Sequence, residues 1–232
     1  MNVMNAIILD TETHTLNGKP IEIAYAPIEI HNGKMTLDKS QLFDQLYSVE
    51  EPISYAAMAV HHILESDLQN QPLYTSFELP TSTQYIIGHN IDYDINAIAR
   101  CGVDVRHIKA ICTLALARKV WPESEAHNIS ALIYQISKGS PKARELLKGA
   151  HRADADIILT ANILMHIVHH LDISTIEELY NASEEARIPK IINFGKHKGT
   201  AISDLPRDYI QWLLRQDDLD NYLKKALETS LV

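Results

Sequence analysis

A short apolar run near the start of the chain ends abruptly in acid. Ile7-Ile8-Leu9 is typical of a strand that is buried on both faces of a sheet. The run continues as Asp10-Thr11-Glu12, and because alternate side chains of a strand share a face, Asp10 and Glu12 point the same way. Two carboxylates held this close repel each other unless a cation lies between them. The pattern is therefore compatible with a hard-metal site, although a solvated strand edge could carry the same residues.

The first half of the chain predicts a mixed sheet. Turn signals at Asn17-Gly18 and at residues 31–34 separate the first three predicted strands, which makes them antiparallel. Two later strands are each followed by a helical pattern. Strands are predicted over residues 7–13, 21–26, 42–49, 85–88 and 108–112. Antiparallel strands followed by strands that alternate with helices predict an α/β fold with a mixed five-stranded sheet flanked by helices.

The second half of the chain is predicted to be mostly helical. A long helix begins near His151, because apolar residues recur at helical spacing from Ile157 to Leu171. The pattern changes near Asp172, where a shorter helix and then a basic turn follow. The predicted division is a main domain over residues 1–172, a linker helix over 173–189 and a small, mostly helical C-terminal module over 190–232.

The C-terminal module is predicted to open with a basic turn, Asn193-Phe194-Gly195-Lys196-His197-Lys198-Gly199. Lys196 and Lys198 could grip backbone phosphates, and the flanking glycines would let the main chain approach a ligand closely. The alternative is an exposed turn that its lysines keep soluble. The pattern by itself does not choose between these two interpretations.

Both tryptophans are predicted to be structural. Trp212 shares a helical face with Tyr209 and Leu213, which predicts a core residue. Trp121 precedes a proline and is predicted to lie in the core or at a helix end, rather than to form a platform for base stacking.

Charge and composition exclude several classes of protein. The formal net charge of −9 is the wrong sign for a high-affinity nucleic-acid-binding module, but it permits an enzyme whose acidic site is neutralised by metal ions. Cys101 and Cys112 form neither a disulfide framework nor the spacing of a zinc site. The chain has no apolar run long enough to span a bilayer and no signal-peptide pattern. We therefore expect a cytoplasmic protein with no membrane partner.

Two further acidic clusters lie where predicted helices begin. Asp92 and Asp94 follow the strand over 85–88, and His151 and Asp156 bracket the start of the long helix. Each cluster alone is typical of helix capping, because the helix dipole favours acids there. Together with the two acids of the first strand, one acid from each cluster would give four oxygen ligands, and the histidine is a titratable base. Such a set is what two-metal phosphodiester hydrolysis needs, since histidine can accept the proton of water at neutral pH.

Three motifs in this order carry a family resemblance. Asp-x-Glu, His-Asn-x-x-Tyr-Asp and His-x4-Asp resemble the motifs of the DEDDh 3′-5′ exonucleases, a family of the RNase H-like superfamily. The resemblance runs through nearly the whole chain and implies an RNase H-like fold. It implies that His151 is the general base and that two Mg2+ ions, replaceable by Mn2+, are bound. The metal-binding residues it implies are Asp10, Glu12, Asp94 and Asp156.

Further stretches resemble a bacterial branch of this family. They lie in residues 52–63, in residues 111–122 and in the turn that contains Phe194-Gly195-Lys196. Cys112 stands where proofreading subunits of polymerases usually carry an acid, which disfavours that role. Tyr93 stands where phenylalanine is commoner, and we expect it to have a packing role.

The resemblance also implies contacts with substrate. The loop from Thr13 to Leu16 would border the terminal base, against which Leu16 could wedge. His61 falls in the segment that lies beside the terminal nucleotide in this family, and Asn90 would support the site. With the lysines of the basic turn, the predicted substrate-binding residues are Thr13, Leu16, His61, Asn90, Lys196 and Lys198.

The activity implied is that of a 3′-5′ exodeoxyribonuclease that releases nucleoside 5′-monophosphates by two-metal-ion hydrolysis. Its partners would be DNA 3′ ends, single-stranded or in a frayed duplex, and its role would be in DNA repair or turnover. One alternative is a 3′-5′ exoribonuclease acting on RNA ends or short oligonucleotides, because one sequence does not show how the pocket treats a 2′-hydroxyl. Another is a catalytically silent nucleic-acid adaptor, which would have no need of all five active-site residue types.

Overall fold

The structure is a computed structural model that describes residues 5–231. The chain divides into two compact units, Met1–Ser183 (unit 1) and Glu184–Val232 (unit 2). The division falls inside helix α7 (Ile176–Arg187), and so inside the predicted linker helix.

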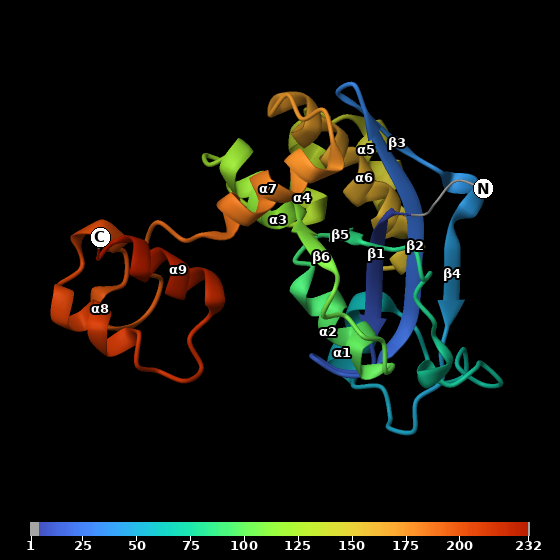
Figure 1. Ribbon diagram of the computed structural model, residues 1–232. Helices are drawn as coiled ribbons and strands as arrows, with labels where there is room; N and C mark the ends of the chain where they lie inside the picture. The colour runs from blue at the N-terminus through green and yellow to red at the C-terminus, as the bar shows by residue number, and fades with distance from the viewer. Residues whose placement is uncertain (1–4, 232) are drawn as a thin grey trace. The chain divides into compact units, whose positions relative to one another are not determined.

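Unit 1 is built on a mixed sheet (Figure 1). In the described residues its strands follow the order β3-β2-β1-β5-β6, and β4 also pairs with β2. β1 is antiparallel to β2, which is antiparallel to β3 and β4, whereas β1, β5 and β6 run parallel. The strands are β1 (Ala6–Thr13), β2 (Pro20–His31), β3 (Lys34–Leu37), β4 (Phe43–Leu46), β5 (Tyr85–Gly88) and β6 (Lys109–Cys112).

The predicted mixed α/β sheet is confirmed, but within residues 5–231 the sheet has six strands rather than five. The additional strand is β3, which follows β2 through a two-residue turn at Asn32-Gly33. Both turn residues have positive φ, as a tight hairpin of this kind requires. β2 is long enough for two partners, since its first half pairs with β4 and its last four residues pair with β3. A four-residue strand with a mixed sequence gives almost no periodic signal, so β3 was not predicted.

Helices cover both faces of this sheet. Ile7 and Leu9 of β1 belong to a buried cluster with Ile91 and Ile98, which lie just before and within α2. By alternation, Ile8 and Asp10 face the opposite side, where the 18-residue helix α6 packs against β1 and β2. Helices α3 and α4 pack against α6 on that side. The helices up to α6 are α1 (Tyr55–His61), α2 (Asp92–Arg100), α3 (Thr113–Val120), α4 (Ile129–Ile136), α5 (Pro141–Leu146) and α6 (Ala153–His170).

Unit 2 has a small core of its own. Helices α8 (Arg207–Leu213) and α9 (Asn221–Thr229) pack on Ile192 and Ile202, which flank the basic turn. A β-bridge between Ile191 and Ala201 closes that turn. The basic turn is therefore held on a folded base.

Trp212 departs from its prediction, because 51% of its surface is exposed. The buried residues of α8 are Tyr209, Ile210 and Leu213. Successive residues of a helix are about 100° apart around its axis. Trp212 is therefore roughly 60° from Tyr209, on the side opposite to Ile210, and lies at the edge of the buried face. The assignment of Trp212 to the core was wrong because the buried face is centred toward Ile210.

Among the residues that the structure describes, no helix is both long enough and apolar enough to cross a membrane.

Candidate active site

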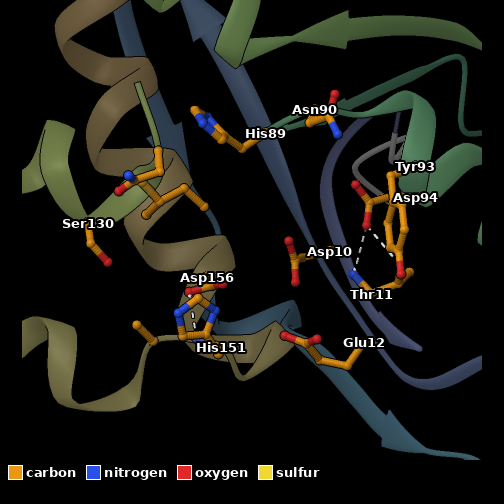
Figure 2. Close-up of a pocket in the computed structure, with 13 residues that line it drawn as sticks. Asp10, Thr11, Glu12, His89, Asn90, Tyr93, Asp94, Ser130, His151 and Asp156 are labelled. Atoms are coloured by element: carbon orange, nitrogen blue, oxygen red, sulfur yellow. Dashed lines mark hydrogen bonds between the residues drawn. The ribbon is translucent and has the colours of Figure 1, made fainter. Parts of the chain in front are cut away.

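A pocket of about 620 Å3 lies at the carboxyl end of β1 (Figure 2). Its walls come from β1, from the first turn of α2, from the start of α4 and from the turn that precedes α6. All five residues predicted as metal ligands or base line this pocket, although they come from segments up to about 150 residues apart. The sheet topology brings them together, since β1 is central and α6 packs across it.

Three of the four predicted metal-binding acids form a compact group, the acidic trio of Asp10, Glu12 and Asp156. Each offers one carboxylate oxygen, and these oxygens lie within 4.8 Å of one another. Asp10 and Glu12 share a face of β1, and Asp156 reaches them from the first turn of α6 (Figure 2). The predicted orientation of the β1 acids is thus observed.

The trio is costly to ionise without a cation. Burial raises the pKa of Asp10 well above its usual range, and the carboxylates of Asp94 and Asp156 raise it further. Burial, then the carboxylates of Asp156 and Glu22, raise the pKa of Glu12 to about 8. Burial also raises the pKa of Asp156, which a hydrogen bond from the His151 backbone partly opposes. A cation among these oxygens would offset the repulsion and displace the protons.

Asp94 lies in the same pocket but outside the compact trio. Its side chain is buried, with 3% exposed, in the first turn of α2. One carboxylate oxygen, Oδ1, accepts hydrogen bonds from the backbone N–H of Thr11 at 3.0 Å and from its hydroxyl at 2.8 Å. Burial raises the pKa of Asp94, and the two bonds from Thr11 oppose that rise. Thr11, which lies between Asp10 and Glu12 in the sequence of β1, therefore holds Asp94 against this strand.

His151 stands in the turn before α6 rather than on the helix, as its spacing from Asp156 predicted. Its backbone is left-handed, with φ of 67°, and its N–H lies 3.3 Å from Oδ1 of Asp156. The side chain is exposed and faces the pocket beside Asp156 and Glu12 (Figure 2). The ring can therefore reach a water molecule in the pocket while the backbone helps to hold a trio member.

An ion pair between the buried Glu22 and the half-exposed Arg152 supports the start of α6, and the sequence did not predict it. Glu22 of β2 is fully buried, directly across the ladder from Glu12. It accepts hydrogen bonds from Arg152 Nε at 2.9 Å and from the N–H of Ala153 at 2.9 Å. These bonds tie β2 to the first turn of α6, which carries Asp156. The available signal was an acid inside the otherwise apolar run Ile21-Glu22-Ile23, but its partner is 130 residues away.

His89 lines the pocket and was given no role from sequence. Its Nε2 lies 2.7 Å from the carbonyl oxygen of His127 and its Nδ1 lies 3.1 Å from the Thr113 hydroxyl. Burial lowers the pKa of His89 to about 4, so the ring is neutral at physiological pH. Its low pKa makes it a weak proton acceptor and both ring nitrogens already have partners, so it serves as an uncharged wall of the pocket. Next to it, a Cβ on Gly88 would lie 3.0 Å from the Leu9 carbonyl oxygen, so glycine allows the end of β5 to lie this close to β1.

The predicted substrate-binding residues of unit 1 fall into two groups. Leu16 is 81% exposed and Asn90 is exposed in the pocket wall, so both are accessible. Thr13 and His61 are 4% and 2% exposed. The Thr13 hydroxyl bonds to the Thr15 carbonyl at 2.8 Å and to the Tyr93 hydroxyl. The side chain of Thr13 is thus positioned to shape the loop that carries Leu16.

His61 is held in the interior of unit 1, whereas the lysines of the basic turn are at the surface of unit 2. The Nδ1 atom of His61 accepts a hydrogen bond from the N–H of Ile63 at 2.9 Å, and burial lowers the pKa of the ring. Lys196 and Lys198 are exposed and belong to unit 2.

The donor set of the pocket fits a hard divalent cation. Carboxylate oxygens are the ligands that Mg2+ and Mn2+ prefer. Arg152 lowers the pKa of Glu12, but its guanidinium is bound to Glu22. Most of the trio's negative charge is therefore left for a metal ion to balance.

Comparison with known proteins identifies the family. A family model described as an exonuclease matches residues 7–164, which is more than half of the chain and includes every pocket residue discussed above. The chain belongs to this exonuclease family. Its members are nucleases that depend on divalent metal ions, in agreement with the acidic trio. Residues 185–231 match a second family model, named for a quorum-sensing-regulated virulence factor.

Individual relatives agree with the predicted bacterial branch, which is exonuclease X. Exodeoxyribonuclease 10 of Escherichia coli strain K12 is 29% identical over 216 residues, covering 91% of each chain. A structure of exonuclease X in complex with 5′-overhanging duplex DNA has a TM-score of 0.58 at 28% identity, covering 77% of this chain and 99% of that one. A structure of E. coli exonuclease I with single-stranded DNA, at 14% identity and a TM-score of 0.52, shares the fold over 80% of this chain and 43% of the other. The predicted resemblance is confirmed.

Proposed function

We propose that the chain is a 3′-5′ exodeoxyribonuclease that removes nucleotides from DNA 3′ ends and releases nucleoside 5′-monophosphates. The observation that carries the proposal is the convergence of the acidic trio, Asp94 and His151 on one pocket. Similarity to an exodeoxyribonuclease over 91% of the chain supports DNA as the substrate. A role in DNA repair or turnover is part of the same proposal.

The proposed cofactor is a pair of Mg2+ ions, which Mn2+ can replace. The trio would hold them together with Asp94, whose Oδ2 is not used by Thr11. When bound, such ions act as Lewis acids that stabilise charge on the attacking and leaving oxygens of a phosphodiester.

The residues of the chain have separate tasks in the proposed hydrolysis. His151 accepts the proton of the attacking water, because its ring is exposed to the pocket and stands beside Asp156. Glu22 and Arg152 keep the start of α6 in place, so that Asp156 and His151 keep their positions relative to β1. Thr11 does the same for Asp94.

Substrate contacts in unit 1 are proposed for the loop after β1 and for the pocket wall. Leu16, at 81% exposed, would pack against the terminal base, and Thr13 would hold the loop in shape. Asn90 would support the site at the wall, and His61 would back the segment beside the terminal nucleotide. We also propose that residues 1–172 contain the complete catalytic site and that residues 190–232 serve it as an accessory module.

The proposal is tested by incubating duplicate DNA oligonucleotides, labelled at either the 5′ or the 3′ end, with the protein and Mg2+. We expect early release of labelled mononucleotide from the 3′ end and progressive shortening of the 5′-labelled strand. Shortening from the 5′ end, or activity that persists in EDTA, would contradict the proposal. An RNA oligonucleotide of the same sequence distinguishes the exoribonuclease alternative, and binding without any cleavage would support a silent adaptor.

A further inference from the structure

Unit 2 carries an aromatic surface that its fold does not require. Trp212 is 51% exposed and stacks on Tyr209 with ring centroids 5.6 Å apart and planes 22° from parallel. The two rings line a pocket of about 440 Å3 with Gly195, Lys196 and Asp208. We call the surface formed by Gly195, Lys196, Tyr209 and Trp212 the Trp212 platform. Aromatic side chains with a few polar groups beside them are the usual lining of a ligand pocket.

Contacts with His197 and Gly195 hold Tyr209, and so the platform, in place. Tyr209 is 9% exposed and lies between Trp212 and His197, whose ring centroid is 4.5 Å away. Gly195 has a φ of 65°, and a Cβ there would lie 3.0 Å from the Tyr209 hydroxyl oxygen. Glycine therefore lets the basic turn lie against the platform. Ordering this surface on binding would cost little, because the aromatic stack is formed already.

The charge around the platform differs from that of the remaining chain. Unit 2 contains eight Lys or Arg and eight Asp or Glu, so the net charge of −9 resides in unit 1. Residues 186–203 contain no carboxylate, and within them lie Lys190, Lys196 and Lys198. Lys196 Nζ lies 5.3 Å from the centroid of the Tyr209 ring. A basic turn beside a stacked, exposed aromatic is complementary to a strand that presents both phosphates and unpaired bases.

We propose that the Trp212 platform binds single-stranded nucleic acid, with one base stacked on Trp212 and the flanking phosphates at Lys196 and Lys198. Asp208 on the pocket wall repels phosphate and can accept a hydrogen bond from a base amino group, which orients the strand. The inference deepens the proposed function, on which it rests, by adding a second substrate contact outside the catalytic pocket. A strand held by unit 2 raises the effective concentration of nucleic acid for unit 1.

The test measures binding in the full chain without cleavage. The chain has two tryptophans, so Trp121→Phe leaves Trp212 as the single reporter. In EDTA, a 20-nucleotide oligo(dC) is expected to quench Trp212 fluorescence, and an abasic strand of the same length is expected to bind more weakly. Trp212→Ala, followed by the anisotropy of labelled DNA, should weaken binding about 5- to 150-fold, the worth of one stacked base, while Trp212→Phe retains most of the affinity.

Two matched measurements complete the test. Tyr134→Ala, which removes a 40% exposed aromatic of unit 1, should leave binding unchanged. Replacing both Lys196 and Lys198 by alanine should reduce the slope of log affinity against log salt by about 1.4, because each phosphate contact on a single strand contributes roughly 0.7. The stacking proposal would be overturned if the abasic strand bound as tightly as the normal strand, or if polyglutamate, which has charge but no bases, bound as tightly as oligo(dC). It would also be overturned if Trp212→Ala left the affinity unchanged.

Failure of this inference is distinguishable from failure of the proposed function. If Trp212→Ala binds oligo(dC) like the unsubstituted chain while Mg2+-dependent 3′ cleavage is intact, the platform proposal fails alone. If the platform binds in EDTA and no cleavage occurs with Mg2+, the catalytic proposal fails alone. If both proposals hold, Trp212→Ala is expected to raise KM for long single strands and to leave kcat on a dinucleotide unchanged.

Discussion

Replacing Glu12 by glutamine is expected to make the metal-free protein more stable. In the folded chain, burial and the carboxylates of Asp156 and Glu22 raise the pKa of Glu12 from 4.5 to about 8. Between these two pH values the folded protein holds a proton that the unfolded chain has released. The free energy of unfolding therefore falls as the pH rises from 4.5 to 8, and Glu12→Gln removes this contribution.

The magnitude follows from the same pKa. At about 1.4 kcal/mol for each tenfold change in proton affinity, a pKa of about 8 in place of 4.5 corresponds to at most about 5 kcal/mol. Glu12 is only partly buried, so water screens its charge, and we expect roughly 1–3 kcal/mol to be measurable. For a chain of this size that is about 2–12 °C in the unfolding temperature of unit 1.

The assay is calorimetric unfolding in EDTA at several pH values between 5 and 8.5, repeated with saturating Mg2+. In EDTA, Glu12→Gln and the unsubstituted chain should be similar at pH 5, and the variant should be the more stable at pH 8. With Mg2+ the order should reverse, because the unsubstituted chain gains binding free energy that the variant has lost. Glu78→Gln, at an exposed glutamate, is the control. A variant that is less stable than the unsubstituted chain in EDTA at pH 8 would refute the reasoning.

Three further substitutions test the site. Asp10→Ala should abolish metal-dependent cleavage, since the remaining acids cannot hold both ions; near-native release of mononucleotide by this variant would remove the central claim. His151→Ala should lower kcat by about 10²–10⁴ with little change in DNA affinity, and a rate unchanged between pH 6 and 9 in the unsubstituted enzyme would show that His151 is not the base. Arg152→Met should destabilise unit 1 by about 2–3 kcal/mol in urea, because it leaves Glu22 charged and buried. Adding Glu22→Gln should recover most of that loss, and a double variant no more stable than Arg152→Met would exclude the ion pair as the cause.

Local sequence patterns were enough to predict much of the site. The shared face of Asp10 and Glu12 was predictable because the side chains of a strand repeat their direction every two residues. Asp156 and His151 were predictable because a five-residue spacing cannot place both on one face of a helix, which put His151 in the preceding turn. These inferences needed only neighbours in sequence.

Features that depend on distant partners were not predictable in this way. Glu22 is an ordinary acid in a strand until Arg152 is found beside it, 130 residues later. Thr11 similarly lies 83 residues from Asp94, so their two hydrogen bonds exist only in the folded chain. Trp212 was misassigned for a third reason, since helical spacing locates a face but does not fix where the buried face is centred.

The left-handed backbone of His151 has a practical consequence. Only glycine adopts φ of 67° without steric cost, and for other residues the cost is about 1–2 kcal/mol. His151→Gly should therefore lose the base without losing the turn that holds Asp156 through its N–H. The variant would keep the acidic trio and its metal affinity while turning over too slowly to consume its substrate. This variant is therefore suited to determining the structure of the protein with uncleaved DNA bound at its 3′ end.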